Sequence, residues 1–420
     1  MRQKNLILPK YSIGVGDRFG YQCEAQLRAI IRAIDEGINV IPVWNKSDRE
    51  HLIIGTSPED TRKAADRAVR ALNWDRPYFV DADHINLKNV NKFIEYSDFF
   101  TIDVAEFIGI APSKVKFEHF FEKNKKYSDS LKISGITKAY TITEETLTRI
   151  GQKFLNAVIE AGKIYRHIES VKGTGKFITE VSMDESDRVQ TPVELFFILS
   201  MITDERIPIQ TIAPKFTGKF NKGIDYVGNI EKFTQEFEEN LAVLRFAVKE
   251  LDLPSNLKLS IHSGSDKFSL YPVIRNGLKK FDTGVHLKTA GTTWLEEIIG
   301  LAMAEGEGLV IAKEIYKQAH KQLDKLCAPY AAVINIDKDK VPLPEEVGRW
   351  DGDTFVKVLQ HNQSCELFNP HFRQLLHVAY KIAAEMGKRY LNALEKNKDK
   401  IGVNVTENLY ARHIKPLFRE

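Results

Sequence analysis

Two histidines with acidic neighbours stand where short apolar runs give way to polar residues. His84 follows Asp83 at the end of one run, and His262 ends another, with further acids close by. Imidazole and carboxylate ligands, with no thiolate beside them, suit Zn, Mn, Co, Ni or Fe. Asp225, in the glycine-containing stretch 215–226, could place a carboxylate between the two histidines. Because no spaced metal motif such as HExxH is present, the residues alone also allow ordinary hydrogen-bonded histidines.

Two glycine-containing loops have the composition of an anion site. Residues 263–267 read Ser-Gly-Ser-Asp-Lys, and residues 288–293 read Lys-Thr-Ala-Gly-Thr-Thr and lead into a helix. The N–H groups at a helix N-terminus attract a phosphate or a carboxylate. Lys267, Lys288 or Arg18 would supply the counter-charge. The simpler alternative is a Thr-capped helix preceded by ordinary turn glycines.

Acidic residues that could exchange protons with a substrate occur in two separate places. Asp83 stands in the first, and the second contains Glu180, Asp184, Glu185 and Asp187. Carboxyl groups that lie near a cation can have different pKa values, so that one is ionised and serves as a base while another is protonated and serves as an acid. Because the two groups are distant in sequence, they can approach a substrate from two sides. The sequence does not choose among the acids of the second group.

These residues lie at the ends of a repeated pattern, in which a short β-rich segment ends in polar residues and a helical stretch follows. Short apolar strands that alternate with helices form parallel sheets, and eight of them favour an α/β fold of the (β/α)8 TIM-barrel type. Working side chains of such barrels lie at the C-terminal strand ends, which adds Asp17 and Lys215 to the substrate-binding candidates. An open doubly wound sheet is the alternative, but no GxGxxG follows the first strand. The predicted strands are residues 12–16, 40–44, 78–83, 100–104, 177–182, 208–213, 258–263 and 284–289.

Two regions depart from this alternation and set the expected domain organisation. We predict that residues 1–105 and 176–294 form the barrel. Residues 106–175, between strands four and five, are too long for an ordinary loop. They predict an inserted helical subdomain that could cover the barrel mouth. Residues 295–420 predict a helical C-terminal extension packed on the barrel.

Composition sets limits on partners and location. The chain has 420 residues and a formal net charge of +3, too small an imbalance for a nucleic-acid surface. Cys23, Cys327 and Cys365 are widely separated, which argues against disulfides and favours a reducing cytoplasm. No apolar run is long enough to span a membrane. We expect a cytoplasmic protein that binds a small molecule, with its oligomeric state left open and a homo-oligomer among the alternatives.

Short segments spread over most of the chain, from about Tyr11 to Phe418, match a known enzyme family. They include IGVGDRFG (13–20), FVDADHI (79–85), FTIDVA (100–105), EVSMDE (180–185), FTGKFNKGID (216–225), LSIHSGSDKF (259–268), GVHLKTAGTTW (284–294), HVAYK (377–381) and NLY (408–410). With these segments the chain resembles the tagaturonate epimerase family. The resemblance implies interconversion of D-tagaturonate and D-fructuronate, two keto-uronates of hexuronate catabolism, with a divalent metal.

The resemblance also implies roles for individual residues. His84, Asp225 and His262 are the implied ligands of one divalent cation. Asp83 is the implied proton acceptor, and a strand-five acid is the implied donor, with Glu180, Glu185 and Asp187 as candidates. Two other functions stay open from the residues: a metal-dependent aldolase or epimerase acting on a ketose phosphate, and a non-catalytic sugar-acid-binding barrel.

Overall fold

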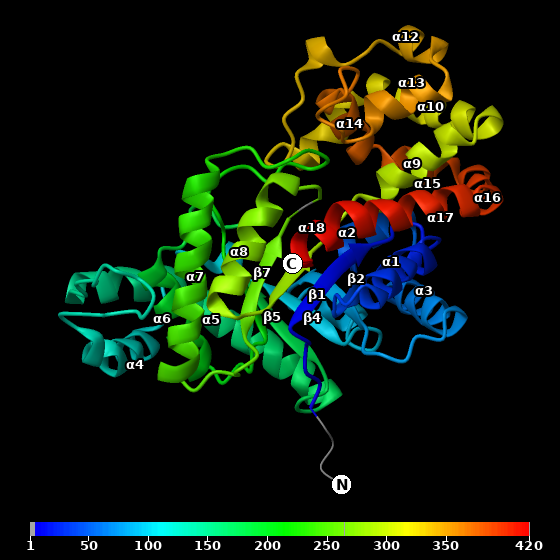
Figure 1. Ribbon diagram of the computed structural model, residues 1–420. Coiled ribbons are helices and arrows are strands. Elements are labelled where there is room, and N and C mark those ends of the chain that lie inside the picture. The colour runs from blue at the N-terminus through cyan, green and yellow to red at the C-terminus, as the bar shows by residue number, and fades with distance from the viewer. Residues whose placement is uncertain (1–4, 264, 420) are drawn as a thin grey trace.

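The strands form one closed parallel barrel, in which each strand pairs with the next and β8 pairs with β1 (Figure 1). The computed structural model describes residues 5–263 and 265–419. The predicted (β/α)8 barrel is confirmed, and each predicted strand overlaps an observed one. The strands are β1 (Tyr11–Gly16), β2 (Val40–Ser47), β3 (Phe79–Ile85), β4 (Phe99–Asp103), β5 (Ile178–Ser182), β6 (Thr211–Ala213), β7 (Lys258–His262) and β8 (Val285–Lys288).

Helices follow the strands and cover the outside of the barrel. In the described ranges, β3 alone is not followed by a full helix, and the short 3-10 turn η1 (Val90–Lys92) comes after it. In α6 the Thr191 side chain and Glu194 form a capping box, and Pro192 opens the first turn, which together fix where this helix begins. The covering helices are α1 (Cys23–Asp35), α2 (Asp48–Ile54), α3 (Pro58–Ala71), α5 (Glu144–Lys172), α6 (Pro192–Asp204), α7 (Ile230–Glu250) and α8 (Tyr271–Phe281).

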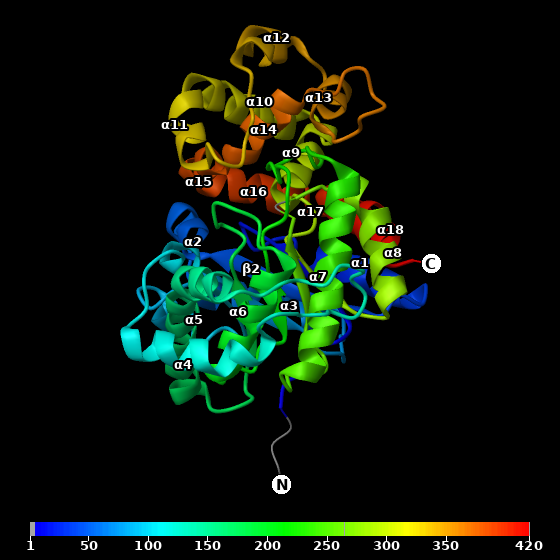
Figure 2. The same cartoon turned by 90° about the vertical axis from the view of Figure 1, so that its left-hand side faces the viewer.

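Residues 106–175 contain two long segments with different roles. α5 packs against β4 and α6 and joins the main apolar core, so it fills the place of the helix that follows strand four. α4 (Lys114–Asn124) lies outside that order, and two of its lysines pair with Asp204 and Glu205 at the C-terminal end of α6. Because that end leads into the start of β6, it is the end away from the mouth. The insertion therefore flanks the barrel and does not cover its mouth (Figure 2).

The C-terminal extension stands beyond the C-terminal ends of the strands and has its own apolar core, which includes Trp294, Ile315 and Phe372 (Figures 1 and 2). Its last helices, α17, η7 and α18, return to pack on α1 and α8. The extension consists of α9 (Thr293–Met303), α10 (Gly306–Lys321), α11 (Leu323–Cys327), α12 (Pro344–Arg349), α13 (Gly352–Leu359), α14 (Pro370–Val378), α15 (Tyr380–Met386), α16 (Lys388–Lys396), α17 (Lys398–Glu407), the π-helical η7 (Asn408–Ile414) and α18 (Lys415–Phe418).

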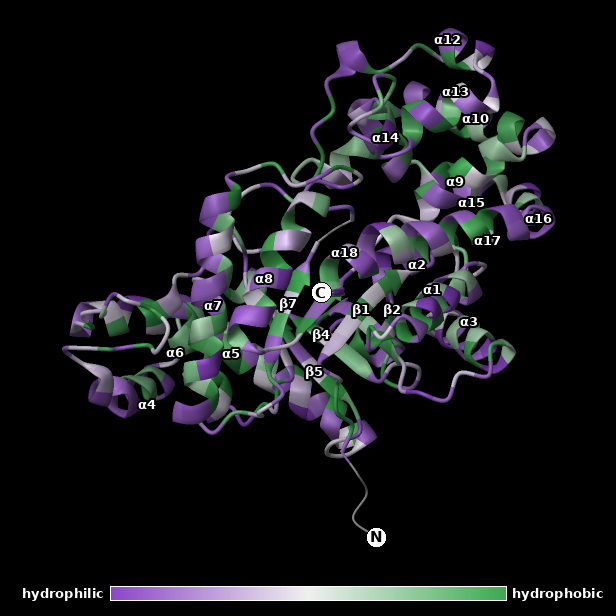
Figure 3. Cartoon of the chain, viewed as in Figure 1, coloured by the Kyte–Doolittle hydropathy of each residue, from purple (hydrophilic) through white to green (hydrophobic). Residues whose placement is uncertain are grey.

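Apolar and polar residues alternate along the helices of both parts (Figure 3). The apolar ones pack into the barrel core or into the core of the extension. Among the described residues, no helix combines the length and the hydropathy that crossing a membrane would require.

Candidate active site

An irregularity in β3 turns two adjacent side chains toward the barrel mouth. Successive side chains of a regular strand point to opposite faces, but the pairing of β3 with β4 shifts register between Ala82 and Ile85. His84, inside this shift, has a φ of 53°, in the left-handed region that strains a residue other than glycine. As a result, Nδ1 of His84 lies only 2.7 Å from Oδ1 of its neighbour Asp83.

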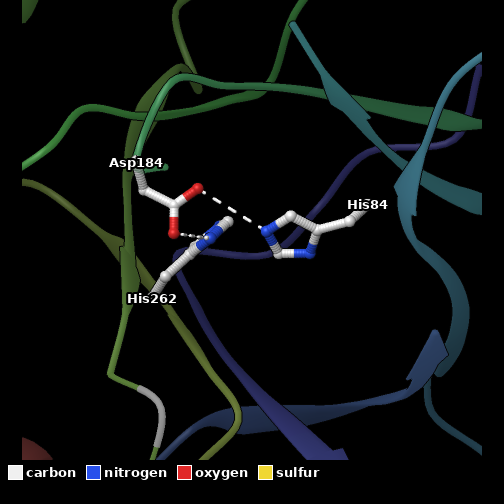
Figure 4. Close-up of side chains that lie close together, drawn as sticks. All are labelled: His84, Asp184 and His262. Carbon is white, nitrogen blue, oxygen red and sulfur yellow. Dashed lines mark ion pairs between the residues drawn. The ribbon is translucent and has the colours of Figure 1, made fainter. Parts of the chain in front are cut away.

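His84, Asp184 and His262 each bring one ligand atom to within 4.8 Å of the others (Figure 4). Asp184 lies just after β5, and its carboxylate faces both imidazoles. Its Oδ2 is 3.0 Å from Nδ1 of His262, and its Oδ1 is 3.5 Å from Nε2 of His84. Atoms that bind one ion at about 2.1 Å lie roughly 3–3.5 Å apart. The two distances between Asp184 and the imidazoles therefore match those between ligands of one cation, and the imidazole nitrogens lie within 4.8 Å of each other.

The other ring nitrogen of each histidine contacts a further carboxylate. Nε2 of His262 lies 2.8 Å from Oε1 of Glu180, just as Asp83 contacts Nδ1 of His84. In metal sites the ring nitrogen that does not bind the ion commonly donates to a carboxylate, which fixes the tautomer. Nδ1 of His262 is buried and has no well-aligned hydrogen bond within the described part of the chain. The donor set of two imidazoles and one carboxylate fits a divalent cation.

The charges of this cluster act strongly on one another. Burial disfavours the imidazolium of His262, but Asp184 and Glu180 raise its pKa to about 9. Burial also opposes the charge on Asp184, yet His262 and His84 hold the pKa of that carboxyl well below its usual range. Protons on the histidines offset the negative charge of the carboxylates, and a bound cation would displace those protons.

Lys288, at the end of β8, is the centre of an adjoining buried ionic network. Its Nζ lies 2.9 Å from Asp81, 2.8 Å from Asp83 and 3.5 Å from Glu180. Burial opposes the ammonium, but these carboxylates raise the pKa of Lys288 above its usual value. Burial raises the pKa of Asp81 to about 6. Burial acts in the same direction on Asp83, but Lys288 and His84 outweigh it and hold the pKa of Asp83 well below its usual range. Asp83 is therefore held in its ionised form.

Asp225 does not join the two histidines. Its carboxylate accepts hydrogen bonds from the backbone N–H and the hydroxyl of Ser269, the latter at 2.9 Å, and from the N–H of Tyr226. These bonds tie the loop after β6 to the turn that precedes α8. The structure places Asp184 with His84 and His262, where the resemblance suggested Asp225.

Lys267 and Lys288, predicted to bind a substrate anion, are both engaged within the protein. Nζ of Lys267 donates to the carbonyl oxygens of Asn221 and Ile224 at 2.9 and 2.8 Å, and so joins the loop after β7 to the loop after β6. Lys288 is held by carboxylates. Because neither ammonium is free, the geometry does not support a phosphate pocket built on these two lysines.

The other predicted substrate-binding residues differ in environment. Asp17 accepts two hydrogen bonds from backbone N–H groups in the turn before α1, so it has a structural role. Arg18 lies at the mouth and pairs with Glu50 at 3.0 Å. Lys215 is partly buried, and its Nζ is 3.5 Å from the carbonyl oxygen of Asp184. Arg18 and Lys215 are therefore the two of this set that lie close to the mouth.

The three predicted strand-five acids separate in space. Glu180 is fully buried in the ionic network around Lys288 and His262. Glu185 is exposed, and it offers a ligand atom close to those of His84 and Asp103. Asp187 is exposed and belongs to neither group of ligand atoms. Of the three, Glu185 is the acid that could reach a small molecule at the mouth.

Asp81 and Asp184 are the candidates whose importance the sequence understated. Asp81 stands two residues before Asp83 on the same strand, so the two side chains share a face of the sheet. That spacing is the signal that could have identified Asp81. No local pattern distinguishes Asp184 from the acids around it, because it lies in the turn after β5 and its direction depends on that turn.

Fold and site together define a class: a (β/α)8-barrel enzyme whose histidines and carboxylates gather at the C-terminal mouth. Comparison with known proteins is more specific. The chain belongs to the tagaturonate epimerase family, a family of isomerases, whose model matches residues 3–417.

Individual relatives agree with this assignment. The tagaturonate/fructuronate epimerase of Thermotoga maritima is 27% identical over 423 residues, which covers 96% of this chain and 80% of the relative. The native crystal structure of the fructuronate-tagaturonate epimerase UxaE from Cohnella laeviribosi matches with a TM-score of 0.79 and 22% identity, over 97% of this chain and 81% of that one. A form of the same enzyme with two glycerol molecules matches equally well, with a TM-score of 0.79. The two crystal structures support the fold.

Proposed function

We propose that this protein interconverts D-tagaturonate and D-fructuronate. Its family and the relative from Thermotoga maritima support this reaction. The observation that carries the proposal is the group of His84, Asp184 and His262 at the mouth, beside the ion pair of Asp83 and Lys288. The proposal includes a cytoplasmic setting in hexuronate catabolism, with a keto-uronate as substrate.

One divalent cation is part of this proposal, and it is expected to be Zn, Mn, Co, Ni or Fe because the ligands are imidazole and carboxylate. His84, Asp184 and His262 would hold it. Such a cation acts as a Lewis acid that stabilises negative charge on substrate oxygens. Asp83 and Glu180 orient the two imidazole rings through their other nitrogens.

The two keto-acids differ at C4, a hydroxyl-bearing carbon β to the C2 ketone. The carbonyl does not acidify that C–H bond, so we propose cleavage and re-formation of the C3–C4 bond. Asp83 accepts the proton of the C4 hydroxyl, C4 becomes an aldehyde, and the electron pair of the broken bond forms an enediolate on the other fragment. Rotation about C4–C5 presents the second face of the aldehyde. The bond re-forms with C4 inverted, and Glu185 returns a proton to the C4 oxygen. Proton exchange with water then restores Asp83 and Glu185 to their starting forms, and no oxidant is required.

Removal of the metal is expected to abolish the activity. Purified protein would be analysed for metal content and then incubated with D-tagaturonate, with formation of D-fructuronate followed by NMR. Dialysis against a chelator should reduce turnover to background, and one of the five metals should restore it. Full activity in metal-free protein would contradict the cation. Turnover of ketose phosphates in place of keto-uronates, or keto-uronate binding without turnover, would contradict the proposed reaction.

Cleavage of the C3–C4 bond makes a separate prediction about label exchange. When the reaction runs with an added isotope-labelled three-carbon aldehyde acid, label is expected to appear in C4 to C6 of both epimers. Mass spectrometry of the products measures it. Epimerisation without incorporation, in protein that carries a tightly bound nicotinamide, would indicate transient oxidation and contradict the cleavage.

A further inference from the structure

Three cationic side chains gather at the barrel mouth against two tyrosines of the C-terminal extension. The guanidinium of Arg18 lies 4.3 Å from the ring centroid of Tyr380. Arg49 and Lys222 lie over the ring of Tyr330, at 4.8 and 5.9 Å. The hydroxyls of the two tyrosines are 2.7 Å apart. One pair of aromatic rings therefore positions cations from the segments that follow β1, β2 and β6.

Positive charge in this group exceeds negative charge. Glu50 pairs with Arg18 at 3.0 Å, whereas the described residues supply no acid that pairs with Arg49 or Lys222. Burial, followed by repulsion from Arg18 and Arg49, lowers the pKa of Lys222, although Glu50 and Asp83 act in the opposite direction. A bound anion would offset this repulsion.

His377, on α14, packs against Gly223, the residue that follows Lys222, and its imidazole is unsatisfied among the described residues. It is 3% exposed, and neither of its ring nitrogens has a hydrogen-bond partner among the residues that the structure describes. Burial, reinforced by Arg18, Lys222 and Arg373, holds the pKa of His377 well below its usual range. The imidazole is therefore neutral and offers one N–H. A buried donor without an acceptor destabilises the folded state, and a ligand oxygen would satisfy it.

We propose that Lys222, Arg18 and His377 form the subsite that binds the carboxylate of the substrate. The inference rests on the proposed function, because a keto-uronate carries its carboxylate at C6, at the far end from the ketone. Lys222 and Arg18 donate charge-assisted hydrogen bonds, and His377 donates a neutral one. Among the charges that act on Lys222 is that of Asp83, the acid proposed to accept the C4 hydroxyl proton.

This subsite gives the C-terminal extension a role in the reaction. When the C3–C4 bond breaks, the carboxylate stays on the aldehyde fragment. A fixed carboxylate keeps that fragment in place while C4 turns about the C4–C5 bond. Tyr330, His377 and Tyr380, which all lie in the extension, thereby select acids over uncharged ketoses.

Lys222→Met tests the subsite, with Lys219→Met as the matched control, because Lys219 is an exposed lysine of the same loop. Loss of one charge-assisted hydrogen bond should raise KM for D-tagaturonate on the order of 10- to 100-fold, and the weaker hold on the aldehyde fragment should lower kcat by a smaller factor. Lys222→Arg should recover most of the affinity, and Lys219→Met should behave as wild type. An unchanged KM in Lys222→Met, or an equal rise in Lys219→Met, would overturn the inference.

A binding experiment separates this inference from the proposed reaction. Calorimetric titration with D-gluconate, a carboxylate of the same chain length without a ketone, measures the subsite without turnover. Wild type should bind it, and both Lys222→Met and His377→Phe should bind it at least about tenfold more weakly. If wild type binds gluconate but converts no keto-uronate, the reaction fails and the subsite stands. Equal binding by wild type and both variants, or binding by none, refutes the subsite.

Discussion

Asp184→Asn is expected to bind the proposed cation more weakly and to lower kcat/KM on the order of 10²- to 10³-fold. It removes the charge of a proposed ligand, and a Lewis-acid cation stabilises a transition state by several kcal/mol. The substitution keeps the size of the side chain and removes the charge that faces His84 and His262. Metal content and keto-uronate turnover, measured on the same preparation, provide the readout.

Asp225→Asn is the matched comparison, since the same change is made in the acid that the family resemblance suggested as ligand. Its carboxylate accepts hydrogen bonds from Ser269 and Tyr226, so the variant should keep its metal and lose some thermal stability. Metal loss in Asp225→Asn with retention in Asp184→Asn would contradict the ligand set. It would also mean that the loop after β6 moves when a cation binds.

Arg373→Met is expected to lower the free energy of unfolding by about 3–5 kcal/mol, because it leaves a buried carboxylate without its cation. Arg373, on α14, is fully buried, and one terminal nitrogen donates to Asp266 at 2.7 Å and to Thr292 at 2.9 Å. Its Nε donates to the carbonyl oxygen of Gly223 at 2.6 Å. One side chain of the extension thus joins the loops after β6, β7 and β8. Urea denaturation measures the effect.

Arg389→Met is the control for that measurement. Arg389 pairs with Glu314 on the surface, and both side chains are more than 40% exposed, so the loss should be about 1 kcal/mol or less. Addition of Asp266→Asn to Arg373→Met should recover part of the stability, because it removes the unpaired buried charge. A loss in Arg373→Met no greater than in Arg389→Met would refute the role of this residue.

The sequence by itself determined the barrel fold and the approximate location of the candidate active site at the strand ends. Eight short apolar segments separated by helical stretches predicted the parallel strands, because burial on both faces requires such runs. Since parallel strands of a barrel end on one side, His84 at the end of β3 and His262 at the end of β7 could be assigned to the same mouth. Most of the segments that carry the family resemblance lie at strand ends, and the others lie in the loop after β6 and in the C-terminal extension.

Only the tertiary structure decided which acids and bases face one another. The register shift in β3 turns both Asp83 and His84 to the mouth, and no strand pattern contains that shift. Asp184, rather than Asp225, faces the histidines because the turn after β5 and the contact of Asp225 with Ser269 fix both carboxylates. Contacts between residues more than a hundred positions apart engage Lys288 in the ionic network. Within the described part of the chain, the same folding leaves the imidazole of His377 without a hydrogen-bond partner. Side-chain direction and long-range pairing are properties of the folded chain, and local sequence does not encode them separately.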